Sequence, residues 1–229
     1  SQTEDGNMDA SAGQRAYRDL QQHIDELKKR DLLYEIDEPV NKDTEMSALV
    51  RWQFRGGLRE EDRKAFLFNN PIDSKGRDYD IPVVIGALAA NQDIYATGMD
   101  TKVDDIAAKW AAAIANPVPP RLVNEAPCHD VIIEGSDLLT EEGGLVQLPI
   151  PLSTPGFDST PTLAATNVIT KNPDTGTQNM GTYRAGLKSS NRLVVRMATR
   201  VGGAEGYMHW KTHKSRGEKL PCAIVVGCP

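Results

Sequence analysis

The residues best suited to chemistry lie in a short polar run beyond the middle of the chain. Asn179 offers an amide oxygen, Arg184 a permanent cation, and Thr182 and Tyr183 place two hydroxyls between them. An amide carbonyl is a hard ligand suited to Mg²⁺ or Mn²⁺, and a guanidinium can form paired hydrogen bonds with a carboxylate or a phosphate. These residue types indicate a site for an anion and a divalent cation. The alternative is a β-hairpin with a solvated arginine.

Strand and turn signals surround this run. Residues 166–170 are β-branched and alternate in polarity, and a turn cluster of Asn, Pro, Asp, Thr and Gly follows at 171–176. Strand-forming residues return at 179–184 and again at 193–197. The pattern predicts a hairpin that leads through a polar, glycine-containing segment into another apolar strand.

The first half of the chain alternates between helical and strand patterns. The strand expected at 81–88 is almost entirely apolar, which predicts a central place in its sheet. Prolines at 117–120 end the last helix. One helix is expected from Arg15, and its apolar face consists of Tyr17, Leu20, Ile24 and Leu27. A second helix is expected after a cap at Asp43 or Thr44, and its apolar face consists of Met46, Leu49, Val50 and Phe54. Strands are expected at 32–36, 65–68 and 81–88, and a third helix follows a capping box at 101–104.

Short strands between Pro and Gly turns dominate the second half. They are expected at 131–133, 163–169, 181–187, 193–198 and 223–226, with one helix at 206–216. This pattern is typical of a barrel-like sheet. The chain is therefore predicted to be α+β, with a polar disordered tail at 1–14, an α/β domain at 15–121 and the barrel-like sheet at 122–229.

Composition excludes several classes of function. The 229 residues are 39% hydrophobic and carry a net charge of −6, and no run of Lys or Arg offers a face for nucleic acid. No apolar stretch is long enough for a membrane span, and the polar, acidic first residues do not resemble a signal peptide. Three cysteines without framework spacing favour a reducing, cytoplasmic setting.

Two further residue pairs contain side chains of types that can bind metals. His209 and His213 have the i, i+4 spacing of zinc ligands on a helix, but no glutamate lies between them, so two half-exposed imidazoles are expected instead. Cys222 and Cys228 are expected to be small buried side chains. Neither a dinucleotide-binding nor a Walker glycine pattern follows a strand.

The run N-M-G-T-Y-R at 179–184, with V-I-T-K-N-P-D-T-G before it and K-S-S-N-R-L and a Gly-Gly pair after it, resembles the UbiD-type decarboxylases. The resemblance extends to 117–128, 148–155 and 217–227, so it covers most of the chain. Enzymes of this family use prenylated FMN to remove, or sometimes add, a carboxyl group on aromatic or α,β-unsaturated acids. The resemblance implies an α/β N-terminal domain followed by a partial split-barrel flavin-binding domain at 122–229.

The resemblance also implies roles for individual residues. Asn179 matches a ligand of Mn²⁺, which bridges to the cofactor phosphate and which K⁺ can accompany. Arg184 matches the catalytic arginine that orients the substrate carboxylate. Some family members have a histidine ligand at the position of Gly202, which this chain lacks. The residues implied to contact prenylated FMN are Thr182, Tyr183, Arg184, Arg196, Met197, Ala198, Val201 and Gly202.

The family chain continues beyond the segment that matches Pro229, where it supplies a glutamate metal ligand, acidic residues beside the arginine and an oligomerisation domain. We therefore expect a fragment or split subunit that is inactive alone. It would need its missing C-terminal part or a partner subunit, a flavin prenyltransferase as cofactor source, and assembly into a homo-oligomer. The expected substrate is an aromatic acid, and the resemblance leans toward the hydroxybenzoate type. The alternative is a non-catalytic flavin-binding or assembly module, in which an open strand edge pairs with a partner.

Overall fold

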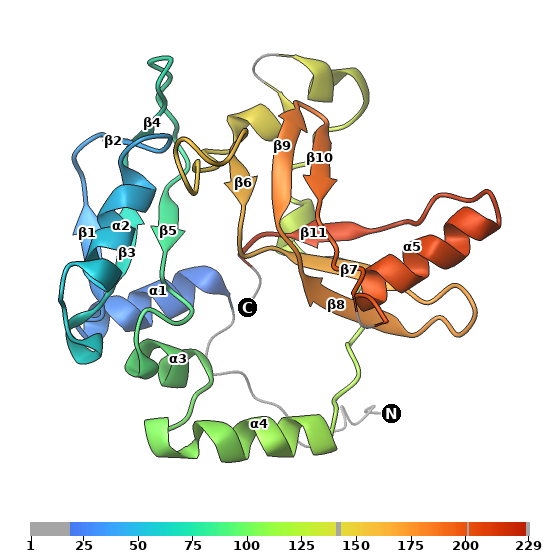
Figure 1. Cartoon of the computed structure of the whole chain (residues 1–229), viewed down its shortest axis with the longest axis horizontal. Coiled ribbons are helices and arrows are strands. Elements are labelled where there is room, and N and C mark those ends of the chain that lie inside the picture. The colour runs from blue at the N-terminus through green and yellow to red at the C-terminus, as the bar shows by residue number, and fades with distance from the viewer. Residues whose placement is uncertain (1–18, 141–142, 201, 228–229) are drawn as a thin grey trace, which may run out of the picture.

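The structure is a computed structural model that describes residues 19–140, 143–200 and 202–227. It is a mixed helix-and-sheet fold. The N-terminal elements gather around one small sheet, and the later strands form two further sheets beside it (Figure 1). The predicted tail at 1–14 and Tyr17 lie outside the described residues.

The first sheet has the order β1-β3-β5, from β1 (Leu33–Ile36), β3 (Ala65–Phe68) and β5 (Val83–Ile85). β3 pairs parallel with β1 and antiparallel with β5. The short strands β2 (Val40–Asn41) and β4 (Pro71–Ile72) form a separate parallel pair. The expected strands at 32–36 and 65–68 are confirmed, whereas the expected central strand at 81–88 is shorter and lies at an edge.

Helices cover both faces of this sheet. Ala65 and Phe68 lie on opposite faces of β3 because their separation is odd. Ala65 packs in a cluster with Leu27 and Ile94, from α1 (Leu20–Lys29) and α3 (Gln92–Gly98). Phe68 packs in a second cluster with Val40, and with Met46 and Val50 from α2 (Met46–Arg55). Coverage on both sides explains why an edge strand such as β5 is apolar throughout.

The expected helix starts differ from those observed. α2 begins after Glu45, and no side chain caps it; Asn41 instead accepts hydrogen bonds from the backbone amides of Asp43 and Thr44. On the apolar face, Leu49 and Phe54 stay largely exposed, while Met46 and Val50 are buried as expected. The helix α3 was not predicted from the sequence; its N-cap Asn91 accepts a hydrogen bond from the amide of Ile94 at 2.7 Å.

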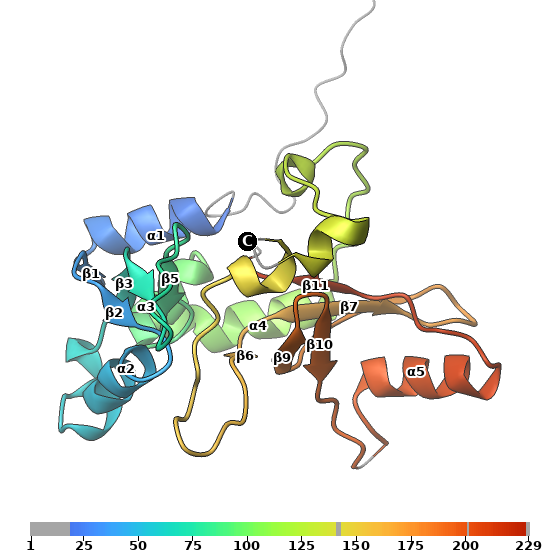
Figure 2. The ribbon, with the colours of Figure 1, turned by 90° about the horizontal axis from the view of Figure 1, so that it is seen from above.

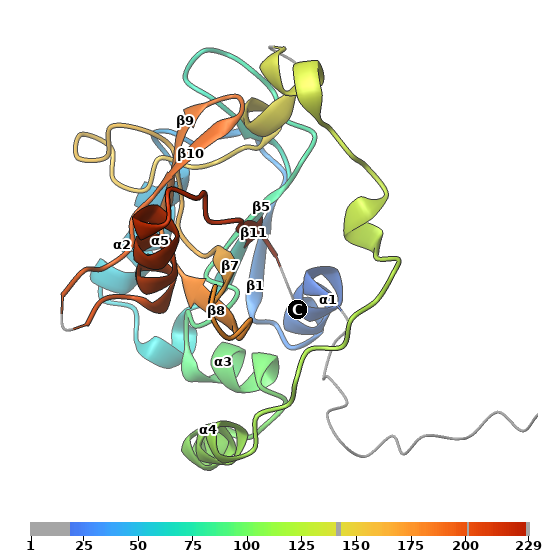
Figure 3. The same cartoon turned by 90° about the vertical axis from the view of Figure 1, so that its right-hand side faces the viewer.

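The helix α4 (Ile106–Ala115) lies at the margin of the molecule, beyond α3 (Figure 3). None of its residues is buried. The expected capping box does not form. The 3₁₀ turn Val103–Asp105 has Lys102 as its N-cap and leads directly into α4, whose own N-cap, Asp105, has a helical backbone and makes no side-chain cap hydrogen bond. No helix in the described ranges combines the length and apolar character that crossing a membrane requires.

Two three-stranded sheets make up the second half. One has the order β10-β9-β6 and the other β11-β7-β8, and all their pairings are antiparallel. Three 3₁₀ turns at Pro127–His129, Gly135–Leu139 and Gly144–Gln147 precede them. The strands are β6 (Thr162–Leu163), β7 (Asn167–Lys171), β8 (Gln178–Thr182), β9 (Ala185–Ser189), β10 (Arg192–Val195) and β11 (Ala223–Val225).

Several predicted strands need correction. Residues 131–133 form no strand, and Val131 and Ile132 are exposed. The segments 163–169 and 181–187 each divide into two strands. The segment 181–187 is interrupted at residues 183–184, where the chain passes from one sheet to the other. The sheets do not close into a barrel within the described ranges. The predicted helix is confirmed as α5 (Glu205–Ser215), which packs along β7 and β8 (Figures 1 and 2).

Candidate functional site

The turn between β7 and β8 sets the position of Asn179. The side chain of Asn172 accepts hydrogen bonds from the amides of Asp174 and Thr175, and Gly176 takes a φ of 73° that favours glycine. This turn fixes a register in which Asn179 lies directly opposite Thr170. Directly opposed residues of an antiparallel pair share one face, so Asn179 and Thr170 both face α5. The half-buried Asn179 has a fully buried Nδ2 atom with no hydrogen-bond partner in the described structure.

A buried histidine lies behind this face. The Nδ1 atom of His209 lies 2.9 Å from Oγ1 of Thr170, and the two side chains are 3% and 1% exposed. The Nε2 atom of His209 makes no hydrogen bond among the described residues; Oε1 of Glu205 lies 3.6 Å away. His209 is therefore buried, so the prediction of a half-exposed imidazole at this position was wrong. The glycine three residues before it, Gly206, is also buried, and this small residue on the same face was the signal for close packing.

Tyr183 connects the end of β8 to the start of α5. Its hydroxyl accepts a hydrogen bond from the amide of Gly206 at 3.3 Å, and its carbonyl accepts one from Oγ1 of Thr166 at 2.9 Å. The ring lies against Gly181, where an added Cβ would overlap it. A Cβ on Gly206 would meet the same ring at 3.0 Å and Met197 at 3.3 Å. Glycine at both positions permits this close approach.

Arg184 lies where the chain leaves β8. Its Nη2 atom lies 3.3 Å from Oδ1 of Asp158, and its side chain is half exposed. Its carbonyl accepts from the amide of Arg196 at 3.0 Å, which ties this crossing to the end of β10. Within the described residues no hydrogen bond joins Arg184 to Asn179. The two residues therefore lie near the same crossing but contact different elements.

The other predicted cofactor contacts surround the same crossing. Thr182 is exposed and donates to Oδ1 of Asn167 at 3.3 Å. Arg196 and Ala198 are exposed, and Met197 is half-buried. Gly202 has a φ of 85° and open space around it, while Val201 lies outside the described residues. Exposed cysteines at Cys128 and Cys222 contradict the expected burial of Cys222; Cys228 is not described.

These residues fit only part of a flavin and metal site. The buried amide of Asn179 lacks a partner and could turn its oxygen toward a cation. Arg196 and the open turn at Gly202 suit a phosphate in charge and space. No group of three or more His, Cys, Asp or Glu side chains that could hold a metal gathers anywhere in the described ranges. A metal at Asn179 would therefore need further ligands.

A pocket of about 350 Å³ lies elsewhere, on the N-terminal half beside α2. Its lining is largely apolar and includes the exposed Trp52 and one carboxylate, Glu45. That carboxylate already accepts from the amide of Asn41 at 2.7 Å. In Figure 1, α2 and β8 lie on opposite sides of the molecule, so this pocket is separate from the residues predicted from sequence.

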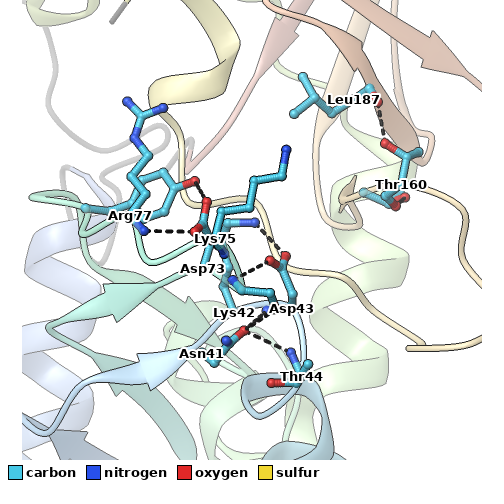
Figure 4. Close-up of polar contacts among 12 residues, drawn as sticks. Asn41, Lys42, Asp43, Thr44, Asp73, Lys75, Arg77, Thr160 and Leu187 are labelled. Carbon is cyan, nitrogen blue, oxygen red and sulfur yellow. Dashed lines mark hydrogen bonds and ion pairs between the residues drawn. The ribbon is translucent and has the colours of Figure 1, made fainter. Parts of the chain in front are cut away.

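A buried lysine stabilises the junction between the two halves. Lys42 is 5% exposed, and its Nζ atom lies 2.6 Å from Oδ1 of Asp43 (Figure 4). Its ammonium also lies 5.8 Å from the ring centre of Tyr79, whose hydroxyl donates to Asp73 at 3.1 Å. The carbonyl of Lys42, just after β2, accepts from the amide of Leu152 at 3.1 Å, which joins the N-terminal half to the segment that leads into β6.

Burial and charge shift two pKa values in this cluster. Burial is the largest of the effects that raise the pKa of Tyr79 to about 12, and the nearby Asp73 carboxylate adds to it. Burial would raise the pKa of Asp73, but hydrogen bonds from the amides of Arg77 and Lys75 and from Tyr79 outweigh it and leave that pKa lowered. Sequence reasoning missed this cluster because its members lie on separate loops.

Two family models match the chain. Residues 24–114 match the 3-octaprenyl-4-hydroxybenzoate carboxy-lyase N-terminal domain, and residues 121–229 match the Rift-related domain of the same enzyme. Together the two models account for most of the chain.

Solved structures agree with this match. The UbiD-class enzyme HmfF from Pelotomaculum thermopropionicum, in complex with FMN, is 28% identical with a TM-score of 0.74, over 91% of this chain and 42% of that one. An evolved dimeric form of HmfF in complex with prFMN is 25% identical with a TM-score of 0.72, over 93% of this chain and 45% of that one. The apo 3,4-dihydroxybenzoic acid decarboxylase AroY from Klebsiella pneumoniae has a TM-score of 0.76 over 93% of this chain and 43% of that one, and its 21% identity shows the fold alone. The chain thus spans less than half the length of these proteins.

Proposed function

The chain belongs to the UbiD family of carboxy-lyases, and from this we propose that it forms part of an enzyme that reversibly decarboxylates an aromatic or α,β-unsaturated acid. The proposal includes prenylated FMN as cofactor, because a similar structure holds prFMN. It also includes Mn²⁺, with K⁺ as an accompanying cation. We assign the α/β domain to 15–121 and a partial split-barrel domain to 122–229. The exposed, free Cys128 and Cys222 suit a reducing cytoplasm.

The observation that carries the proposal is the buried amide of Asn179. A buried polar group without a partner is costly and calls for an explanation. Asn179 faces α5 at a register set by the β7–β8 turn, and its Nδ2 is buried without a partner in the described structure. A half-turn of the amide would place its oxygen there as a metal ligand. We therefore assign Asn179 to the metal that neutralises the cofactor phosphate.

Other residues of the crossing have distinct tasks in this proposal. Arg184 orients the substrate carboxylate, since its half-exposed guanidinium has donors beyond the one directed to Asp158. Thr182, Tyr183, Arg196, Met197, Ala198, Val201 and Gly202 contact the cofactor. When bound, prenylated FMN supplies the electron sink for the charge left by departing CO₂. The acid that returns a proton is assigned to no residue of this chain.

The proposed activity belongs to an assembly larger than the 229 residues. The similar proteins are more than twice as long as the segment that this chain matches. We propose that the remaining metal ligands and the proton donor come from the part of the family's fold that this segment does not match, on the same polypeptide or on a partner subunit. We also propose that the enzyme is a homo-oligomer. Its cofactor would come from a flavin prenyltransferase.

Co-expression with a flavin prenyltransferase tests the proposal. The whole enzyme that contains this segment should bind a flavin with the absorbance and mass of the prenylated form, and it should release CO₂ from one of a panel of aromatic and unsaturated acids. Arg184→Ala should abolish turnover. Arg192→Ala is the matched control, because Arg192 is an exposed arginine of β10 with no assigned role. Full turnover in Arg184→Ala would contradict the proposal, and flavin binding without CO₂ release would favour a non-catalytic module.

A further inference from the structure

A carboxylate holds the arginine to which we assign substrate binding. Oδ1 of Asp158 lies 3.3 Å from Nη2 of Arg184, and the two residues are 26 apart in sequence. Asp158 is the more buried partner: its side chain is 20% exposed, against 50% for Arg184. Its second oxygen, Oδ2, is buried and has no hydrogen-bond partner in the described part of the chain. Asp158 is therefore a largely enclosed carboxylate that contacts one side of the half-exposed guanidinium of Arg184.

This pair differs from an ordinary surface ion pair. Exposed pairs contribute little and form between two mobile side chains. Here a half-buried carboxylate whose buried oxygen lacks a partner would be costly without a nearby cation. The enclosed Asp158 thus restricts where the guanidinium of Arg184 can lie. Within the described residues this contact engages Nη2 alone, so the other N–H donors of the guanidinium can bind a ligand.

The backbone that carries Asp158 is itself fixed. The amides of Phe157 and Asp158 both donate to the carbonyl of Thr154, at 3.0 and 2.9 Å, which closes a turn. Just before this turn the chain is tied to the N-terminal half. Nη2 of Arg51, on α2, donates to the carbonyl of Ser153 at 3.2 Å and to Oγ1 of Thr154 at 3.1 Å.

A second tie lies two residues earlier. The amide of Leu152 donates to the carbonyl of Lys42 at 3.1 Å, and Ile150 is 2% exposed. We call residues 152–158 the strap. The strap runs from contacts on the N-terminal half to the carboxylate beside Arg184. One of these contacts is with Lys42, which belongs to the cluster drawn in Figure 4.

We infer that Asp158 is a positioning residue for Arg184, and that the strap makes the position of this guanidinium depend on its attachment to Arg51 and Lys42. This inference rests on the proposed function for the role of Arg184, but the contacts themselves do not. A cation fixed from one side presents its remaining donors in a constant direction, and catalysis is sensitive to displacements of about 1 Å in such groups. Attachment to the N-terminal half would then set the activity of a residue in the second half.

Chemical labelling of Arg184 tests the positioning without any cofactor. Phenylglyoxal condenses with the nitrogens of the guanidinium group, so weakening the ion pair that holds Nη2 should speed the reaction. In the whole protein, Asp158→Asn should increase the labelling rate of Arg184, followed by peptide mass spectrometry, by at least about threefold. Asp158→Glu keeps the charge and should restore most of the protection. Asp174→Asn is the matched control, since it breaks a different aspartate–arginine pair, with Arg216.

The strap is tested in the same assay. Arg51→Ala should raise the labelling rate of Arg184 by about twofold, since the charge of Asp158 remains while its backbone support is weakened. Arg55→Ala, another exposed arginine on α2, should leave the rate unchanged. Circular dichroism confirms that each variant is folded. Labelling of Arg184 at the wild-type rate in folded Asp158→Asn would overturn the inference, and a wild-type rate in Arg51→Ala would remove the strap from it.

Kinetics of the loaded enzyme separate this inference from the proposed function. Asp158→Asn should lower kcat/KM by about 10- to 100-fold, with Asp158→Glu partly restoring it. If Arg184→Ala abolishes turnover and Asp158→Asn has no effect, the positioning role fails and the proposed function stands. If Arg184→Ala leaves turnover intact, the proposed function fails, whatever the labelling rates show.

Discussion

Thr170 and His209 join β7 to α5 through a contact of 2.9 Å between two almost fully buried side chains. Thr170 is also the residue directly opposite Asn179. The imidazole thus supports, from the helix side, the strand that positions the proposed metal ligand. This arrangement makes the packing of α5 a condition for the geometry of the site.

Replacing His209 should therefore destabilise the second half of the protein. His209→Ala removes a buried ring and leaves the Thr170 hydroxyl without its partner, so the free energy of unfolding should fall by about 2–4 kcal/mol. Urea denaturation followed by circular dichroism measures this change. His213→Ala is the control on the same helix: His213 pairs with Glu218, which is 54% exposed, and the expected loss is below about 1 kcal/mol. Equal losses in both variants would contradict the supporting role of His209.

The glycine in N-M-G-T-Y-R should prove essential for steric reasons. A Cβ at position 181 would overlap the ring of Tyr183, so Gly181→Ala must displace that ring and its hydrogen bond to the Gly206 amide. We expect a loss of about 1–3 kcal/mol in the free energy of unfolding, together with weaker flavin binding by the whole enzyme. Tyr183→Ala removes the obstacle, so adding Gly181→Ala to that variant should cost little. Strict additivity of the two changes would show that the ring is not the cause.

The sequence predicted local elements well and the partners of their side chains poorly. The hairpin around 171–176 was foreseen because turn residues act over a few positions, and the helix α5 was foreseen as well. The edge position of β5 was not foreseen, because helices cover both faces of the first sheet and make an edge strand as apolar as a central one. An apolar run records burial, not the order of strands.

In the candidate site, too, the sequence predicted the residues but not the partners of their side chains. The identity of Asn179 and Arg184 indicated a chemistry, and strand alternation indicated that Asn179 would face one side of a sheet. The break at residues 183–184 sends the chain into a second sheet, and this moves Arg184 to a partner 26 residues earlier, Asp158. Pairs so far apart arise from the tertiary fold, and nothing in their spacing predicts them. His209 was likewise expected to be half-exposed, because the strand β7 that buries it lies far away in sequence.

Loss of the carboxylate beside Lys42 should be costly. The side chain of Lys42 is 6% exposed, so Asp43→Asn leaves a buried ammonium without its counter-ion, and the free energy of unfolding should fall by about 3 kcal/mol. Asp31→Asn is the control: its pair with Lys64 is equally short at 2.6 Å, but Asp31 is 88% exposed. Asparagine also tolerates the φ of 58° at this position, so the expected change is below about 1 kcal/mol. Similar losses in both variants would show that burial of Lys42 is not what matters.

The phenol of Tyr79 should ionise at a higher pH than an ordinary tyrosine. Burial, and then the charge of Asp73, raise its pKa from 10.0 to about 12. The neutral phenol is thus favoured in the folded state. Its contribution to stability is complete below pH 10 and is lost as the pH rises through about 12.

Ultraviolet absorbance of tyrosinate follows this titration directly. One of the six tyrosines should ionise at about pH 12 in the wild type, and this step should be absent from Tyr79→Phe. Asp73→Asn removes the carboxylate charge and should shift the late step to lower pH. Circular dichroism at each pH ensures that the protein is still folded. Tyr79→Phe should also lose less stability than the wild type between pH 10 and pH 12, and an identical alkaline decline in the two proteins would contradict the assignment.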